Sequence, residues 1–276
     1  MDAGNLVVGT VGVAALAAAA LIGWHGRQLP TVVARRLPDR HGASALDGLR
    51  TMAAIVGAGL VAGILVPGLG GRAYMRLMAV TSGADAQGRL TEAEEVVGDI
   101  TFGGTLGFVG FVGMVLPAVA ALGYLGLRHF LPSRVASGSS MFGVLLLGLF
   151  GVDDPLSPDN VDFEILGPLW LAVGGIVALS LLFAWTFGAL ATRFDRGVEP
   201  LGSSVRAIPG HAGLAMAVVP PFVFVTAPYV LLRGALRGRA RPLLEQRAVK
   251  AVGTTLVGLA TVVAAIVSID AAAQIL

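Results

Sequence analysis

The chain alternates between long apolar runs and short charged segments. A helix needs about 20 apolar residues to cross the hydrocarbon core of a bilayer. Lipid offers backbone N–H and C=O groups no hydrogen-bond partner, so each run must be helical or be shielded by other helices. The pattern therefore predicts an all-α, polytopic integral membrane bundle that forms a single transmembrane domain over 1–276. The apolar runs lie at about 5–24, 51–68, 103–127, 137–152, 166–191, 212–232 and 251–269.

Two of these runs depart from a simple spanning helix. The run at 137–152 is short for a span and would need flanking residues or a thinned bilayer. The run at 212–232 contains Pro220, Pro221 and Pro228. Each proline removes an N–H and clashes with the preceding turn, so a straight helix is not expected there. The sequence therefore predicts six spans plus a proline-broken segment, which either re-enters the membrane from one side or crosses it as a kinked helix.

Composition supports the membrane assignment and excludes several chemistries. The mean hydropathy is +0.82 and 13% of residues are charged, whereas about a quarter are charged in soluble proteins. The absence of cysteine excludes disulfides, thiolate metal sites and cysteine nucleophiles. A single lysine, Lys250, stands against eighteen arginines, a bias typical of GC-rich bacterial genomes. We therefore expect a multi-pass protein of the bacterial inner (cell) membrane.

Charge placement predicts the orientation, because cytoplasmic loops carry an excess of Lys and Arg. With the N-terminus outside and 212–232 re-entrant, sixteen basic residues fall inside and three outside; if 212–232 crosses, the counts are ten and nine. We prefer the first arrangement, whose basic inner face would attract anionic lipids. The inside set is Arg27, Arg35, Arg36, Arg40, Arg50, Arg128, Arg134, Arg193, Arg196, Arg206, Arg233, Arg237, Arg239, Arg241, Arg247 and Lys250.

The first outer segment, 69–100, combines two arginines with a group of carboxylates. Arg72 and Arg76 are four residues apart, so on a helix they share a face. Thr91 and Glu94 match a capping box. This match predicts a helix that begins at about Glu92 and runs into the third span.

On that expected helix, Glu92, Glu95 and Asp99 would form one stripe descending toward the membrane. Asp99 would lie closest to the hydrocarbon, where an unpaired charge is costly and a basic partner is expected. Two interpretations follow. The charges either hold the outer segment onto the bundle as a structural ion-pair set or form a ligand site.

The second outer segment, DDPLSPDNVDFE, places five carboxylates in twelve residues. Its oxygen atoms are of the kind that calcium and magnesium prefer, although the spacing does not match an EF-hand loop. Prolines stiffen the segment, and the order of VDFEIL predicts that Phe163 and Ile165 dock while Asp162 and Glu164 face outward. An ordinary solvated acidic loop is the other interpretation.

These two segments supply all the candidate site residues. Catalytic candidates are Glu95 and Asp99, and metal-binding candidates, for a divalent cation such as Mg²⁺ or Ca²⁺, are Asp153, Asp159 and Asp162. The candidate ligand-binding set is Arg72, Arg76, Glu92, Glu95, Asp99, Asp153, Asp154, Asp159, Asn160, Asp162 and Glu164.

Glycine spacing predicts where helices approach closely. Gly59 and Gly63 in the second run, and Gly103 and Gly107 in the third, form small-xxx-small pairs. In lipid such pairs let helix backbones come together and so favour association.

Other sequence features narrow the function. No ionisable residue lies near the centre of an apolar run, which argues against ion-coupled transport. No hydrolase, zinc-protease or nucleotide-binding motif is present. Three hypotheses remain, none of which involves nucleic acid. The chain is a non-catalytic binding or assembly protein for a protein or cation, with an acidic, Arg-containing extracytoplasmic site; a membrane enzyme acting on a lipid or prenyl substrate; or a facilitator of small uncharged solutes along 212–232.

Overall fold

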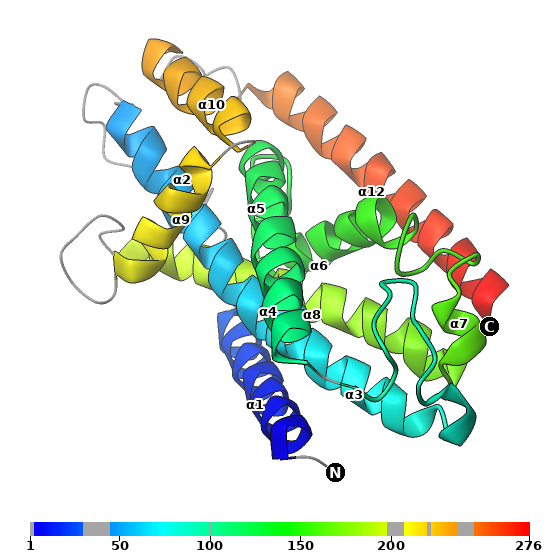
Figure 1. Ribbon diagram of the computed structural model, residues 1–276. Coiled ribbons are helices and arrows are strands. Elements are labelled where there is room, and N and C mark those ends of the chain that lie inside the picture. The colour runs from blue at the N-terminus through cyan, green and yellow to red at the C-terminus, as the bar shows by residue number, and fades with distance from the viewer. Residues whose placement is uncertain (1–2, 30–44, 100, 198–206, 220–221, 237–245) are drawn as a thin grey trace.

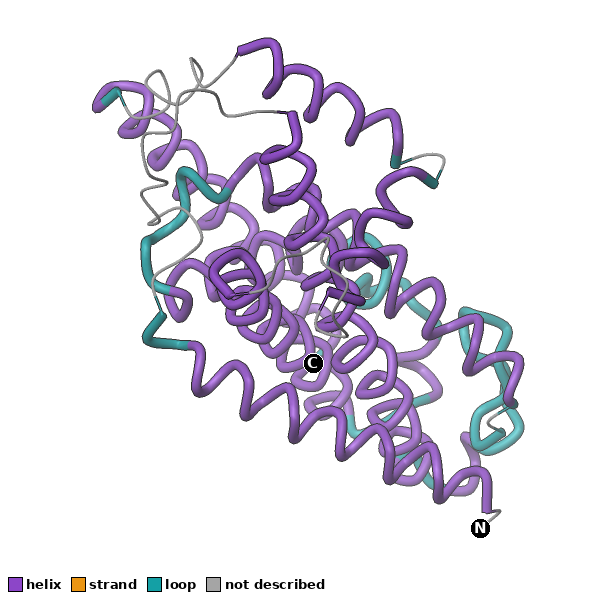
Figure 2. Tube along the Cα trace, turned by 90° about the vertical axis from the view of Figure 1, so that its left-hand side faces the viewer, coloured by secondary structure: helices purple, strands orange, loops and turns teal. Residues whose placement is uncertain are grey.

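A computed structural model of the chain describes residues 3–29, 45–99, 101–197, 207–219, 222–236 and 246–276. These residues form helices joined by loops, which confirms the all-α prediction (Figures 1 and 2). The helices are α1 Ala3–Gly26, α2 Ala45–Gly63, α3 Gly71–Thr81, α4 Phe102–Gly110, α5 Leu116–Leu127, α6 Val135–Leu146, α7 Asp162–Ile165, α8 Leu169–Gly197, α9 Ile208–Val218, α10 Val223–Leu236 and α12 Arg247–Ile275.

Several of these helices join end to end into membrane-length elements. Five helices in the described part of the chain are long and apolar enough to span a bilayer. A sixth apolar helix, Val135–Gly151, is shorter and corresponds to the run at 137–152. The five long helices are Val7–Gly26, Gly48–Thr81, Phe102–Leu127, Leu169–Asp195 and Arg247–Ile275.

The rod formed by α2 and α3 lies at the centre of the bundle, and 72% of its most apolar window is buried. It packs against α1, α5, α8 and α9. Side chains added at Gly59 and Gly63 would meet Pro117, which confirms the predicted close approach. Side chains at Gly103 and Gly107 would meet nothing within 4 Å, so the expectation of a close contact there within the chain is wrong.

Short π-helical segments follow α2, α4 and α6 within the longer apolar helices. They are η2 Ile64–Gly70, η4 Phe111–Val115 and η5 Leu147–Gly151. Pro67 lies inside η2, and Pro117 lies in the first turn of α5, directly after η4. The wider π turn relieves the clash between a proline ring and the carbonyl four residues earlier, so these two rods continue past a residue that would break an α-helix.

Aromatic side chains hold α5, α6 and α8 together. The ring of Tyr124 meets the rings of Phe142 and Phe187 edge-on, with centroids 5.2 and 5.0 Å apart. All three residues are buried. Edge-to-face pairs at this separation add stability beyond the burial of area, so this cluster fixes the three helices relative to one another.

The segment 212–232 is broken, as its prolines predict. Helix α9 ends at Val218, Val219 is extended, and α10 begins at Val223; Pro220 and Pro221 lie outside the described residues. The hydroxyl of Thr226 donates to the carbonyl of Ala217 at 2.7 Å and ties the two helices together. With 11 and 14 residues, neither helix alone reaches the length needed to cross a bilayer.

Candidate functional site

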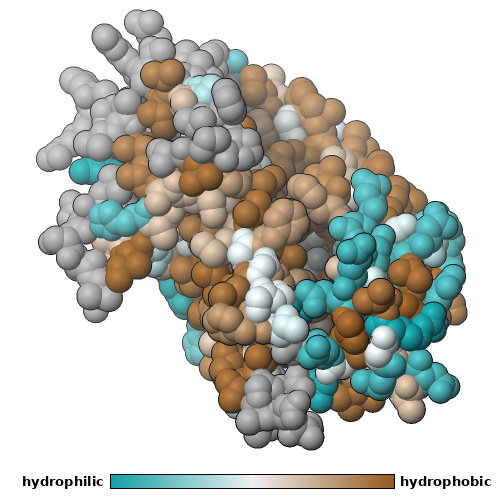
Figure 3. Space-filling view, viewed as in Figure 1, coloured by the Kyte–Doolittle hydropathy of each residue, from teal (hydrophilic) through white to brown (hydrophobic). Residues whose placement is uncertain are grey.

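Two segments, 82–99 and 152–168, form a polar cap at one end of the bundle. Figure 3 shows hydrophilic residues gathered at this end, where Figure 1 places α7, the end of α3 and the C-terminus. The backbone N–H of Glu92 donates to Asp162 Oδ1 at 2.8 Å. Ser82 donates to the Gly167 carbonyl at 3.2 Å and accepts the Gly167 N–H at 2.9 Å. The two segments are therefore joined into one surface.

The first cap segment is a hairpin and not the helix expected from Thr91 and Glu94. Leu90 pairs with Val96, and the Thr91 hydroxyl accepts the Glu95 N–H at 3.2 Å. Glu94 has a φ of 56°, in the left-handed region that a helix excludes. The capping-box prediction is therefore wrong, because the threonine closes a local turn and does not start a helix.

Helix α4 instead begins at Phe102. Its capping residue is Thr101, whose hydroxyl accepts the Gly104 N–H at 3.0 Å. The expected stripe of Glu92, Glu95 and Asp99 therefore does not form. Glu92 and Asp99 are exposed and Glu95 is half-buried.

The second cap segment is anchored by apolar residues and by Asn160. Leu156 is fully buried, and Ile165 packs with Ala79, Ala86 and Val97. Asn160 is 7% exposed, and its side chain accepts the Asp162 N–H at 2.7 Å and donates to the Asp154 carbonyl at 3.3 Å. The segment is therefore packed against the bundle through these residues, and most of its carboxylates are exposed.

Asp162 turns toward the hairpin and is half-buried, so the expectation that it faces outward is wrong. Ile165 docks, Phe163 packs half-buried against the cluster that contains Leu156, and Glu164 is exposed, all as expected. Burial raises the pKa of Asp162, the Glu92 N–H lowers it, and the nearby charge of Asp154 raises it again. The carboxyl therefore links the two segments at an electrostatic cost.

Arg72 lies beneath the hairpin and is only 4% exposed. Its guanidinium carbon is 4.9 Å from the centroid of the Phe108 ring, and its Nε has no hydrogen-bond partner. A side-chain carbon added at Gly104 would lie 3.0 Å from Arg72 Nη2 and 2.6 Å from Glu95 Oε1. The absent side chain of Gly104 thus leaves the space in which the arginine and Glu95 face each other.

The remaining candidates do not converge on one point. Arg76 is half-buried on α3. Within the described residues, no three His, Cys, Asp or Glu side chains gather closely enough to hold a metal ion. The divalent cation and the metal-binding candidates Asp153, Asp159 and Asp162 therefore stay predictions from the sequence. The exposed candidates are Glu92, Asp99, Asp153, Asp154, Asp159 and Glu164.

Two polar residues that support the cap were missed by sequence reasoning. Tyr74 donates its hydroxyl to the Ala172 carbonyl of α8 at 2.7 Å, and its ring lies against Gly175. Gln87 donates to the Ala79 carbonyl at 2.6 Å. A tyrosine near the end of an apolar run is a known interfacial signal, whereas no local pattern marks Gln87.

Comparison with known proteins gives no relative from which to transfer a function. No family model, curated protein or solved structure matches the chain. The cap must therefore be interpreted from its own chemistry.

Proposed function

We propose that the chain is a multi-pass membrane protein whose polar cap binds a cationic partner outside the membrane, without catalysing a reaction. The observation that carries the proposal is that a folded cap, fixed to the bundle, displays many carboxylates and one exposed arginine, Arg89. Such a surface attracts positive charge and repels negative partners. The exposed carboxylates are Asp85, Glu92, Glu94, Asp99, Asp153, Asp154, Asp159 and Glu164.

The proposed topology has six spans, with α9 and α10 re-entrant. Helix α8 begins at the cap, so it ends at the far end of the bundle, opposite the cap. Helix α12 begins at that far end, where Gly253 meets Phe130 just beyond α5, and finishes beside Leu156 of the cap. The chain between α8 and α12 therefore leaves from and returns to the same end, which supports a re-entrant segment over a crossing one.

The charge pattern supports the proposed orientation. The far end holds the described residues Arg27, Arg134 and Lys250. The Ala136 N–H donates to the Arg27 carbonyl at 3.2 Å, which brings the start of α6, next to Arg134, against the end of α1. With the basic far end in the cytoplasm and the cap outside, the chain obeys the positive-inside rule. The bacterial inner membrane and an N-terminus outside complete this proposal, and the basic face would meet anionic lipids.

The two other hypotheses gain no specific support. The catalytic candidates Glu95 and Asp99 differ in setting, since Glu95 faces a buried arginine and Asp99 is exposed. The proline-broken segment packs against α2 through backbone contacts at Gly57 and Gly213, which leaves no described path for a solute between them. The enzyme and the facilitator therefore stay predictions from the sequence.

A peptide-binding measurement tests the cap. A synthetic lysine-rich peptide should bind the protein in nanodiscs, and Glu94→Lys with Asp159→Lys should weaken binding about tenfold, because two attractive charges become repulsive. Raising the salt concentration should weaken the wild-type interaction, since exposed charges are screened. The matched control is Ser133→Lys, which adds a positive charge at an exposed position at the far end of the bundle. Equal binding by all variants would refute the proposal.

Single cysteines test the orientation, because the chain contains none. In intact cells, a membrane-impermeant maleimide should label Ala93→Cys in the hairpin and spare Ser133→Cys at the far end; both sites are exposed. Labelling of Ser133→Cys alone would contradict the proposed orientation and place the far end of the bundle outside the cell.

A further inference from the structure

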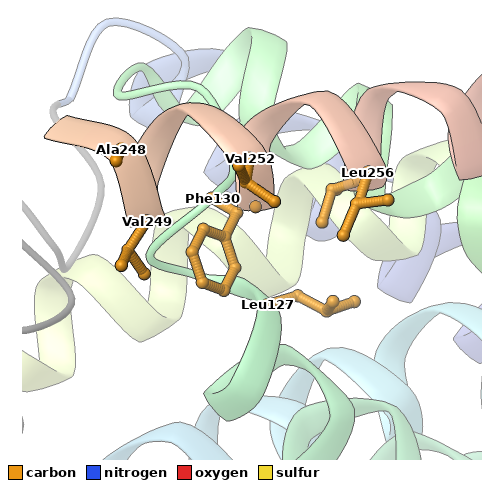
Figure 4. A pocket seen from close by; sticks show the side chains of 8 residues that line it. Leu127, Phe130, Ala248, Val249, Val252 and Leu256 are labelled. Carbon is orange, nitrogen blue, oxygen red and sulfur yellow. The ribbon is translucent and has the colours of Figure 1, made fainter. Parts of the chain in front are cut away.

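Polar groups from three parts of the chain surround a small space at Gly104, in the first turn of α4. The position that a side-chain carbon would take there lies 2.6 Å from Glu95 Oε1, 2.8 Å from Thr101 Oγ1 and 3.0 Å from Arg72 Nη2. The groove between Phe130 and the first turns of α12, by contrast, has an apolar lining (Figure 4). Acyl chains can fill that groove, whereas the space at Gly104 suits a polar occupant.

The buried side chain of Arg72 has hydrogen-bonding capacity to spare. It is 4% exposed, its Nε has no partner, and its Nη1 donates to the sulfur of Met75 at 3.7 Å, a weak acceptor. A guanidinium has five N–H donors and binds oxyanions through two of them side by side. Because a buried donor without an acceptor is costly, Arg72 favours a ligand that has several oxygen atoms.

The beginning of α4 adds a second attraction for negative charge. The N–H groups in the first turn of a helix have no partner within the helix and carry partial positive charge. The Thr101 hydroxyl accepts the Gly104 N–H at 3.0 Å, and Phe102 and Gly103, which come earlier in the turn, are exposed. Arg72 therefore points its Nη2 toward the end of a helix that itself attracts anions.

The hairpin supplies the anion that occupies this space, the carboxylate of Glu95. Leu90 and Val96 form an isolated bridge and not a regular sheet. Glu94 has a φ of 56°, a conformation that is unfavourable for a residue with a side chain. The carboxylate is therefore carried by a segment that can move away without unfolding a helix.

We propose that Arg72, Thr101 and the first turn of α4 form a binding site for a phosphate group, which Glu95 occupies until the hairpin lifts. A phosphate presents more oxygen atoms than a carboxylate, so it can meet the arginine and the helix N–H groups together. It comes either from a free anion or from the head group of a lipid beside α4. The site does not depend on the proposed role of the exposed carboxylates of the cap.

Thermal unfolding with added phosphate tests the site. Purified protein in a neutral detergent is titrated with sodium phosphate at constant ionic strength, and tryptophan fluorescence gives the melting temperature. Because Glu95→Gln removes the charge of the internal competitor, phosphate should raise its melting temperature at a concentration about fivefold lower than for the wild type. Glu92→Gln changes an exposed carboxylate of the same hairpin, so this control should respond like the wild type.

Filling the space separates a bound phosphate from a general effect of salt. Gly104→Ala places a methyl group between Arg72 and Glu95 and should abolish the phosphate response of the wild type and of Glu95→Gln. Gly103→Ala is the matched control, because nothing lies within 4 Å of the added carbon, and it should keep the response. If Glu95→Gln does not fold, the wild-type response at higher phosphate concentration and its loss in Gly104→Ala decide.

The same titration with phosphatidylglycerol identifies the source of the phosphate. A response to the lipid and none to inorganic phosphate assigns a head group, and the opposite result assigns a free anion. The proposal is overturned if neither probe raises the melting temperature, or if Gly104→Ala and Gly103→Ala respond equally.

Discussion

The central rod of α2 and α3 and the peripheral helix α12 have the same mean hydropathy, 2.2, in their most apolar windows, yet 72% of the first window and 17% of the second are buried. Hydropathy therefore reports that both are membrane-length elements but says nothing about their place in the bundle. In lipid, apolar surface alone does not drive helices together, and close packing of small residues does. Side chains at Gly57 and Gly63 would meet neighbouring backbone, whereas one at Gly258 in α12 would meet nothing within 4 Å.

The largest expected effect is the difference in stability between substituting a glycine packed against a neighbouring helix and substituting one that meets no neighbour. Gly63→Leu should destabilise the protein by about 3 kcal/mol, because the new side chain must displace Pro117 and the Gly113 backbone. Gly258→Leu should change stability little. Thermal unfolding in detergent, followed by tryptophan fluorescence, measures both. Equal losses in the two variants would contradict the contrast between rod and periphery.

A smaller effect distinguishes a bond between helices from a bond within one. Tyr74→Phe removes the hydrogen bond from α3 to the Ala172 carbonyl of α8 and should cost about 1 kcal/mol. Thr261→Val on α12 removes only a bond to its own helix, at the Val257 carbonyl, and should stay within about 0.5 kcal/mol of the wild type. The same thermal unfolding assay measures both variants. A larger loss of stability from Thr261→Val than from Tyr74→Phe would overturn this ranking.

The smallest expected effect is on the pH dependence of stability, through Asp162 in the polar cap. Burial raises the pKa of Asp162 above its ordinary value of 3.8. The proton held in the folded state therefore contributes stability below that ordinary value, and this contribution is lost as pH rises through the raised pKa. Asp162→Asn keeps an acceptor for the Glu92 N–H without the charge, so its melting temperature should fall less than that of the wild type between pH 4 and pH 7.

Asp270→Asn is the control for this experiment, because Asp270 is exposed on α12. Its melting temperature should follow the wild type across the same pH range. If Asp162→Asn also follows the wild type, the buried carboxyl does not contribute to the pH dependence of stability.

The fold class could be predicted from the sequence because run length and backbone chemistry allow few solutions in lipid. The short run at 137–152 and the break near Pro220 were also predictable, since length and proline act locally. The place of each helix in the bundle was not. Gly59 and Gly103 begin the same small-xxx-small spacing, but Gly59 meets Pro117 and Gly103 meets nothing within 4 Å. Which glycine is used depends on packing between distant segments.

The candidate site was predictable in location but not in conformation. The two acidic segments meet at one end of the bundle, and Arg72 lies close to Glu95. The hairpin was missed because Thr91 can close a turn as well as start a helix, and the left-handed conformation of Glu94 has no signal in the sequence. The inward turn of Asp162 depends on Glu92, seventy residues away.

The π-helical segment η2 makes the central rod tolerant of one change in the length of the chain. Loss of a single codon between 64 and 70 would allow the rod to rewind as a regular α-helix. A π turn closes its hydrogen bond over one residue more than an α turn, so the shortened segment would turn the chain about as far as η2 does, and α3 would keep the same face toward its neighbours. Arg72 would stay over the ring of Phe108, and Tyr74 would stay at Ala172. A deletion at this depth would thus leave the loops outside the membrane in place.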